Sequence, residues 1–178
     1  MKKAMSILLS VSMLASLGIG QTAFGEEEDN VIRIGVRAPM PGALAVGGEG
    51  SAHSVEMAVE DINALGGYQI EIVNGGEPVD DASDSKQAIN AYNSLMADDP
   101  DVIVGTYNSS CSIPMAELAQ QDQIVMISPG STNYEVTEVG DYIFRTCFID
   151  PYQGTMAAQF AKEQGYATAA VIFANDDD

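Results

Sequence analysis

The chain has few cysteines that could form disulfides and few basic residues that could bind an anion. Its 178 residues include two cysteines, one histidine and no tryptophan, and 7 lysines and arginines stand against 26 aspartates and glutamates. The resulting net charge of −19 repels nucleic acid and anionic membrane, so neither is expected as a partner. Without ligand spacing among cysteine and histidine, no metal site is predicted.

Residues 1–25 are predicted to be a targeting segment. Lys2 and Lys3 precede a mostly apolar run at 7–19, and Ala23-Phe24-Gly25 places small residues where a signal peptidase cuts. The apolar run is shorter than the roughly 20 residues of a membrane-spanning helix. We therefore expect a signal peptide at 1–25 and an exported protein, periplasmic or extracellular.

The sequence leaves two alternatives for the cysteines and predicts a simple turn for a group of aspartates. Cys111 and Cys147 could pair in an oxidising compartment, or could be two free thiols. Asp80, Asp81 and Asp84 do not have the spacing of an EF-hand loop and are predicted to form a solvated turn.

No enzymatic chemistry is expected either. The glycines at 47–50 lack the third glycine of a dinucleotide-binding turn, so no cofactor is predicted. His53 falls on a predicted helix with surface carboxylates rather than beside a serine nucleophile.

Apolar periodicity predicts alternating strands and helices. β-Branched or alternating runs predict six strands, at 31–36, 68–73, 102–104, 124–127, 142–146 and 169–173. Helical spacing predicts a helix capped by Ser51, one over 88–96, one with Pro114 in its first turn and one over 156–161. Loops are predicted at 38–50, 74–85 and 150–154. Such alternation favours an α/β fold, with a parallel sheet between two helical layers.

The stretch 101–133 holds the predicted ligand site. Two buried strands in it end in turns rich in hydroxyls and free backbone N–H groups, at 105–112 and 128–132. Ligands bind outside the carboxyl ends of strands in open α/β sheets. The candidates in these turns are Tyr107, Asn108, Ser109, Gly130, Ser131 and Thr132. The competing interpretation is that Ser109 and Ser110 only cap the next helix and that Thr132 only closes a turn.

The order of elements also predicts the domain organisation. The last strand is not followed by a covering helix, and a new strand–helix set begins near Asp150. We expect 26–148 to be a first, incomplete lobe and 149–178 to begin a second lobe, truncated here.

Six segments, in order from Ile32 to the end, together resemble one family. They are IRIGVRAPMPG, VEMAVEDINALGG, DDASDSKQA, VIVGTYNSSCS, MISPGSTN and FRTCFIDPYQG. The chain resembles the branched-chain amino-acid binding proteins, which are type I periplasmic binding proteins serving ABC transporters. The resemblance implies that the ligand is a small amino acid, held between two closing lobes. It also implies that the protein is a monomer and that its partner is a membrane permease. The alternative is the sensing ectodomain of a receptor with the same fold.

The resemblance also implies roles for individual residues. Ser109 would bind the ligand carboxylate with its hydroxyl and N–H, and Gly130 would give an N–H to the carboxylate and a carbonyl to the ammonium. Thr132 would accept from the ammonium, and Asp150 would support the charged end from the exit of the lobe.

The sequence departs from the family pattern at three places. The family's pocket aromatic falls at Gly47, and the positions of a disulfide found in some members are Ser83 and Asn108. The ligand contacts of the second lobe would lie beyond Asp178. Gly47 and Asn108 together predict a wider or more polar side-chain pocket.

Overall fold

The computed structural model describes residues 30–172, and residues 31–172 belong to one compact unit. The predicted signal peptide lies outside the described residues. Across 30–172, none of the helices combines the length and the apolarity that crossing a bilayer requires.

The sheet is parallel throughout. Its spatial order is β2-β1-β4-β5-β6, and the short β3 pairs with the end of β1. The strands are β1 (Val31–Ala38), β2 (Gln69–Ile72), β3 (Val79–Asp80), β4 (Val102–Val104), β5 (Val125–Ser128) and β6 (Ile143–Arg145). The order changes direction between β1 and β4, which is the point where sheets of this kind bind ligands.

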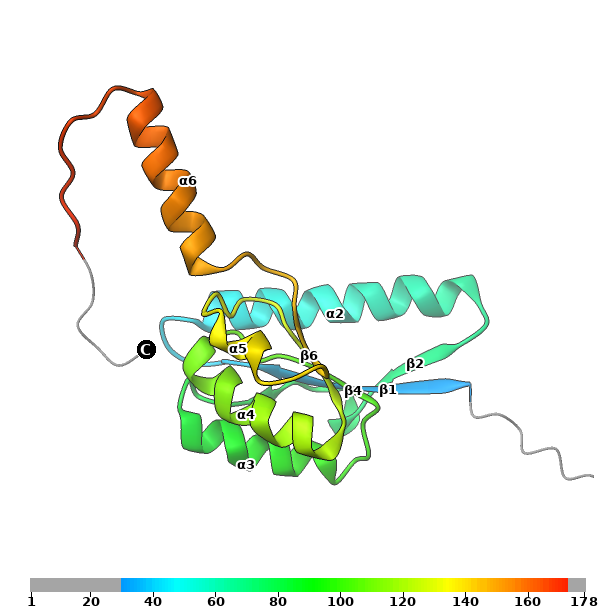
Figure 1. Cartoon of the computed structure of the whole chain (residues 1–178). Helices are drawn as coiled ribbons and strands as arrows, with labels where there is room; N and C mark the ends of the chain where they lie inside the picture. Colours follow the sequence, from blue (N-terminus) through cyan, green and yellow to red (C-terminus); the bar gives the residue numbers. More distant parts are fainter. Residues whose placement is uncertain (1–29, 173–178) are drawn as a thin grey trace, which may run out of the picture. The chain divides into compact units, whose positions relative to one another are not determined.

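Helices lie on both faces of this sheet. Figure 1 shows α2 on one face and α3 and α4 on the other, so the predicted three-layer α/β arrangement is confirmed. The helices are α2 (Ala45–Leu65), α3 (Ser85–Met96), α4 (Ser109–Asp122), α5 (Glu135–Glu138) and α6 (Asp150–Glu163), with a 3₁₀ turn, η1 (Asn74–Gly76).

The main hydrophobic core lies between the sheet and the α3–α4 layer. Ile103 of β4 and Met126 of β5 are fully buried, as the period of two along a strand requires. Leu95 of α3 and Met115 of α4 are also fully buried in the same cluster. This core fixes β4 and β5 side by side, and thus also fixes where their following turns begin.

The start of α2 differs from the prediction. The helix begins at Ala45, so the second half of the predicted 38–50 loop is helical. Ser51 lies inside the helix, where its hydroxyl donates to the Gly47 carbonyl at 2.8 Å, and it is not the N-cap. Close packing explains the glycine at position 48, because a Cβ there would lie 2.0 Å from the Pro39 carbonyl oxygen.

Three further predictions about elements need correction. Residues 150–154 form the start of α6 rather than a turn, with a proline in the first helical turn. The segment 169–172 pairs with no strand, and Val171 and Ile172 are 82% and 98% exposed, whereas Phe173 lies outside the described residues. A β-branched run becomes a strand only beside a neighbouring strand, and the described part of the chain places none beside 169–172. The short β3 and α5 were not predicted.

Two glycines of α2 provide a matched test of this packing. Gly48→Ala should lower the free energy of unfolding by about 1–3 kcal/mol, because the new methyl group overlaps the Pro39 carbonyl. Gly50→Ala meets nothing within 4 Å and should raise it by about 0.5–1 kcal/mol through helix propensity. Urea unfolding of both variants is the measurement. Equal effects would contradict the close approach of α2 to residue 39.

Candidate functional site

The turns that follow β4 and β5 meet, as the sequence predicts. The backbone N–H of Asn133 donates to the Ser109 hydroxyl at 3.2 Å, and thereby joins the start of α4 to the turn after β5. Ser128 Oγ donates to the Thr106 carbonyl at 2.7 Å, which ties the same two turns at a deeper level.

A small cleft of about 210 Å³ opens where these turns meet. Four predicted site residues line it, namely Asn108, Ser109, Thr132 and Asp150, together with Ser110 and Asn133. The N–H of Asp150 donates to the Thr132 carbonyl at 3.0 Å, so the first residue of α6 is held beside the turn after β5. Asp150 is the one charged residue among those that line the cleft.

The first turn of α4 faces this cleft with polar groups still available. Asn108 is the N-cap, but its side chain makes no capping hydrogen bond and instead donates to Ser110 Oγ at 2.9 Å. Its amide oxygen is buried without a hydrogen-bond partner. No acidic residue lies in this turn, so the partial positive charge of the helix N-terminus is not neutralised by a residue of α4 itself.

The first residue of α4 differs from two predictions about this segment. The helix starts at Ser109, inside the predicted 105–112 turn, and Pro114 lies within the helix rather than in its first turn. The cap belongs to Asn108, so the interpretation of Ser109 and Ser110 as simple capping residues does not describe this turn.

A second hollow, a groove of about 550 Å³, lies beside the first. Gly47, Tyr107, Pro129 and Thr146 line it, with apolar residues of α2 and of the sheet. None of its lining residues is charged. Tyr107 and Asn108 are consecutive, yet they line different hollows.

Two predicted site residues, Ser131 and Gly130, line neither hollow. Ser131 is fully buried, its hydroxyl is 2.6 Å from Ser112 Oγ, and it contacts the Tyr107 carbonyl at 3.3 Å. Gly130 lies against the Tyr107 ring, 2.8 Å from it when a Cβ is placed on the glycine. Ser131 therefore joins the two turns from the interior, and Gly130 packs against Tyr107.

Gly47 does not have its predicted effect, which was to widen the side-chain pocket. A Cβ on Gly47 would lie 2.7 Å from Cζ of Tyr107, so the tyrosine ring already occupies the space beside the glycine. The absence of a side chain at position 47 therefore does not widen the groove.

A buried ion pair under the site was not predicted. The side chains of Arg37 and Asp81 are both 0% exposed, with 3.7 Å between Nη2 and Oδ2. Arg37 Nη1 also donates to the Ala88 carbonyl at 2.7 Å, and the Thr106 hydroxyl donates to the Asp81 carboxylate. Burial lowers the pKa of Arg37, and the charge of Asp81 opposes that effect. The prediction of a solvated turn is therefore wrong for Asp81.

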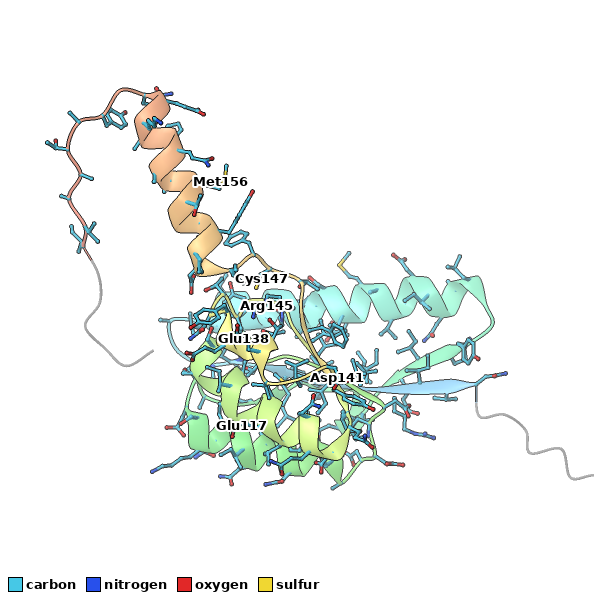
Figure 2. All side chains as sticks on the ribbon, viewed as in Figure 1. Glu117, Glu138, Asp141, Arg145, Cys147 and Met156 are labelled. Carbon is cyan, nitrogen blue, oxygen red and sulfur yellow. The ribbon has the colours of Figure 1, made fainter. Side chains whose placement is uncertain are left out.

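Arg145 is a second missed residue. Its guanidinium donates to the carbonyls of Ser131 (2.8 Å), Asn133 (2.7 Å) and Tyr134 (2.9 Å), and it also donates to the Thr137 hydroxyl. Figure 2 labels it at the end of β6. Both arginines lie in apolar strands of a chain with few cations. This pattern could have predicted their role, because a cation in a buried strand needs partners from the protein interior.

Cys111 and Cys147 do not pair in this structure; both are free thiols, which was the second alternative for them. Cys111 is buried, and burial, followed by the charge of Asp81, raises the pKa of its thiol to about 11. Cys147 is partly exposed, and its thiol contacts the Ser131 carbonyl at 3.2 Å. Among residues 30–172 there is no group of three side chains suited to a metal ion.

Comparison with known proteins agrees with this architecture. The family model described as "Periplasmic binding protein" matches residues 31–178, and the chain belongs to that family. A Leu/Ile/Val-binding protein homolog from Brucella abortus is 35% identical over 99% of this chain. The family resemblance in the sequence is thereby confirmed.

Solved structures of the same kind superpose on the chain. A leucine-binding protein from Thermotoga maritima superposes with a TM-score of 0.66 at 31% identity. A branched-chain amino-acid transporter binding protein from Streptococcus pneumoniae, in complex with isoleucine, superposes with a TM-score of 0.68 at 28% identity. Each superposition covers 75% of this chain and 38% of the other chain. The chain spans about 45% of the length of the Brucella relative.

The ion pair under the site leads to a stability prediction. Asp81→Asn leaves the Arg37 charge buried without a counter-ion, so it should cost about 3–5 kcal/mol of unfolding free energy. Asp84→Asn is the matched control, since Asp84 accepts from the N–H groups of Lys86 and Gln87 at an exposed helix cap. The control should cost less than about 1 kcal/mol. Similar denaturation midpoints for both variants would show that the buried pair is not formed.

The thiols can be distinguished by their reactivity. At pH 8 a thiol with a pKa of about 11 is ionised in about one molecule in a thousand, so Cys111 should not react with Ellman's reagent in the folded protein. Cys147 should react, which gives one thiol per chain before denaturation and two after it. Cys147→Ser should abolish the native reaction and Cys111→Ser should leave it unchanged. Two fast thiols in the folded protein would contradict the burial of Cys111.

Proposed function

We propose that this chain is the first ligand-binding lobe of an exported solute-binding protein that delivers a small amino acid to an ABC permease. Residues 1–25 would be the signal peptide, 26–148 the first lobe and 149–178 the start of the second. The complete protein would act as a monomer in the periplasm or outside the cell. Binding would proceed by closure of two lobes and would involve no catalysis.

The observation that carries this proposal is the composition of the small cleft. Ser109, Thr132 and Asn108 gather around it at the N-terminus of α4, where N–H groups favour a carboxylate. Asp150 lines the same cleft and offers a negative charge to an ammonium group. A zwitterion therefore finds a partner for each of its charges.

Neutral hydroxyls suit such a ligand for a physical reason. Burial of a protein charge without a partner is costly, whereas hydroxyls and backbone groups bind both ends of a zwitterion without adding a charge. In this arrangement Ser109 gives its hydroxyl and N–H to the carboxylate, and Thr132 accepts from the ammonium. Gly130 contributes backbone groups, held in place by its contact with Tyr107.

The class of amino acid follows from the groove and from the relatives. The groove beside the cleft is lined without any charged residue, and the relatives are named for leucine, isoleucine and valine. We therefore expect a branched-chain-like amino acid. The receptor alternative draws no support from these relatives.

Titration of the complete, mature gene product tests the proposal. Isothermal calorimetry with the twenty amino acids should detect a branched-chain ligand, and Ser109→Ala with Thr132→Val should weaken its binding at least about 100-fold, since two hydrogen bonds to charged groups are lost. 4-Methylpentanoate, which is leucine without its ammonium group, should bind far more weakly than leucine.

Ser110→Ala is the matched control for Ser109→Ala. Ser110 lines the same cleft, but its hydroxyl accepts from Asn108, and we assign it no ligand contact. It should change the affinity less than threefold. The absence of heat with every amino acid would rule out the proposed ligand class, and unchanged binding by the double variant would rule out the assigned residues.

A further inference from the structure

The turn that carries Thr132 belongs to no helix or strand. Residues 131–133 lie between the end of β5 and the start of α5, so no regular ladder of hydrogen bonds fixes their backbone. Thr132 lines the small cleft, and its hydroxyl makes no hydrogen bond to any residue that the structure describes. That hydroxyl is available to a ligand, and its position depends on what holds the turn.

Arg145, labelled in Figure 2, holds the backbone around Thr132. Its Nη1 donates to the Ser131 carbonyl at 2.8 Å and to the Asn133 carbonyl at 2.7 Å, one residue before and one residue after the threonine. Arg145 forms no ion pair with a carboxylate among residues 30–172. The planar fork of N–H groups, which commonly binds carboxylates, is thus used on the carbonyls of this turn.

The Thr132 carbonyl has a different partner. It accepts from the N–H of Asp150 at 3.0 Å, and the next N–H, that of Asn133, donates to the Ser109 hydroxyl at 3.2 Å. The peptide group before Thr132 is therefore held by Arg145, and the peptide group after it is held by Asp150 and Ser109. Because peptide groups are planar, their orientations set both backbone dihedrals of Thr132. Its side chain is β-branched, which restricts the rotamers of the hydroxyl as well.

We propose that Arg145 is a positioning residue for the ammonium group of the ligand. This inference rests on the proposed function, in which the Thr132 hydroxyl accepts from the ammonium, and it names the residue that fixes that hydroxyl. Arg145 is not among the residues that line the cleft, so it acts through Thr132. Without the guanidinium, the Ser131 carbonyl keeps only the weak thiol donor of Cys147 among the described residues. The carbonyl then turns towards water, and Thr132 moves with it.

The test compares leucine with 4-methylpentanoate on the complete, mature protein, by calorimetry with displacement for the weaker compound. Since 4-methylpentanoate lacks only the ammonium group, the ratio of the two affinities measures how well that group is held. Arg145→Met keeps the length of the side chain without its donors. It should lower the ratio at least about tenfold, because a hydrogen bond to a charged group is misplaced, and should change the affinity for 4-methylpentanoate less than threefold. A purely structural role would lower the folded fraction and leave the ratio unchanged.

Thr137→Val is the matched control. The Thr137 hydroxyl accepts from Nη2 of the same guanidinium, so its loss removes one hydrogen bond of Arg145 and leaves both bonds of Nη1. This variant should keep the ratio within threefold of the parent's. Arg145→Lys keeps the charge without the fork, so its ratio should lie between those of the parent and of Arg145→Met.

A double variant tests the route from Arg145 to the ligand. In a Thr132→Val background, Arg145→Met should lower the ratio no further, because the hydroxyl that Arg145 positions is already absent. Independent effects of the two substitutions would show that Arg145 does not act through Thr132, and the inference would be wrong.

The outcomes separate this inference from the proposed function. If the parent prefers leucine to 4-methylpentanoate and Arg145→Met keeps that ratio, the positioning role is overturned and the amino-acid clamp stands. If the parent binds the two compounds equally, the positioning role and the ammonium contact of Thr132 both fall. If the parent binds no amino acid, the proposed function falls as well. If Arg145→Met does not fold, Arg145→Lys decides: a ratio equal to that of Thr137→Val overturns the inference, and a lower ratio supports it.

Discussion

The site depends on one buried charge pair, Arg37 with Asp81. Removal of two charges from water is expensive, and hydrogen bonds to the two groups offset part of the cost. Here Arg37 donates from Nη1 to the Ala88 carbonyl, and Asp81 accepts from the Thr106 hydroxyl, whereas Nε and Nη2 of Arg37 are buried without a hydrogen-bond partner. Thr106 in turn accepts hydroxyl hydrogens from Ser112 and Ser128 with its carbonyl. The pair therefore connects the end of β1 to the two turns that form the cleft.

This arrangement divides the hydroxyl residues of the turns into two groups. Ser112, Ser128 and Ser131 are fully buried and bond one another or the backbone of residues 106 and 107. Ser109 and Thr132 lie at the cleft. Small hydroxyls suit both tasks, since each can donate and accept within little volume. A sequence rich in serine and threonine thus provides a rigid floor and a polar surface from the same kind of residue.

Much of the fold could be predicted from local patterns, because buried parallel strands and glycine-terminated helices leave clear periodicities. The strand predicted at 102–104 is found there, the strand predicted at 124–127 is found one residue later at 125–128, and their turns meet as expected. The contacts that could not be predicted are long-range. Gly47 and Gly48 indicate a loop when only neighbours in sequence are considered, yet they lie in a helix, and the close approach of Tyr107 and Pro39 leaves no room for side chains there. Asp81 looks like any other acidic turn residue until Arg37, 44 positions away along the chain, is placed against it. The polar residues next to strand ends could therefore be predicted to lie together, and four of them line one cleft, whereas the residues that support them were not predicted.

The internal use of Arg37 and Arg145 has a further consequence for the outside of the molecule. Both guanidinium groups are engaged with partners from the chain itself, so few cations remain to balance 26 acidic residues. The surface therefore produces a predominantly negative field that, at physiological ionic strength, extends about 8 Å into the solvent. An anionic solute is repelled before it reaches the cleft, whereas the proposed ligand, a zwitterion with no net charge, can approach freely. Under the proposed function, selection among solutes would begin in the surrounding water, ahead of any contact with the turns.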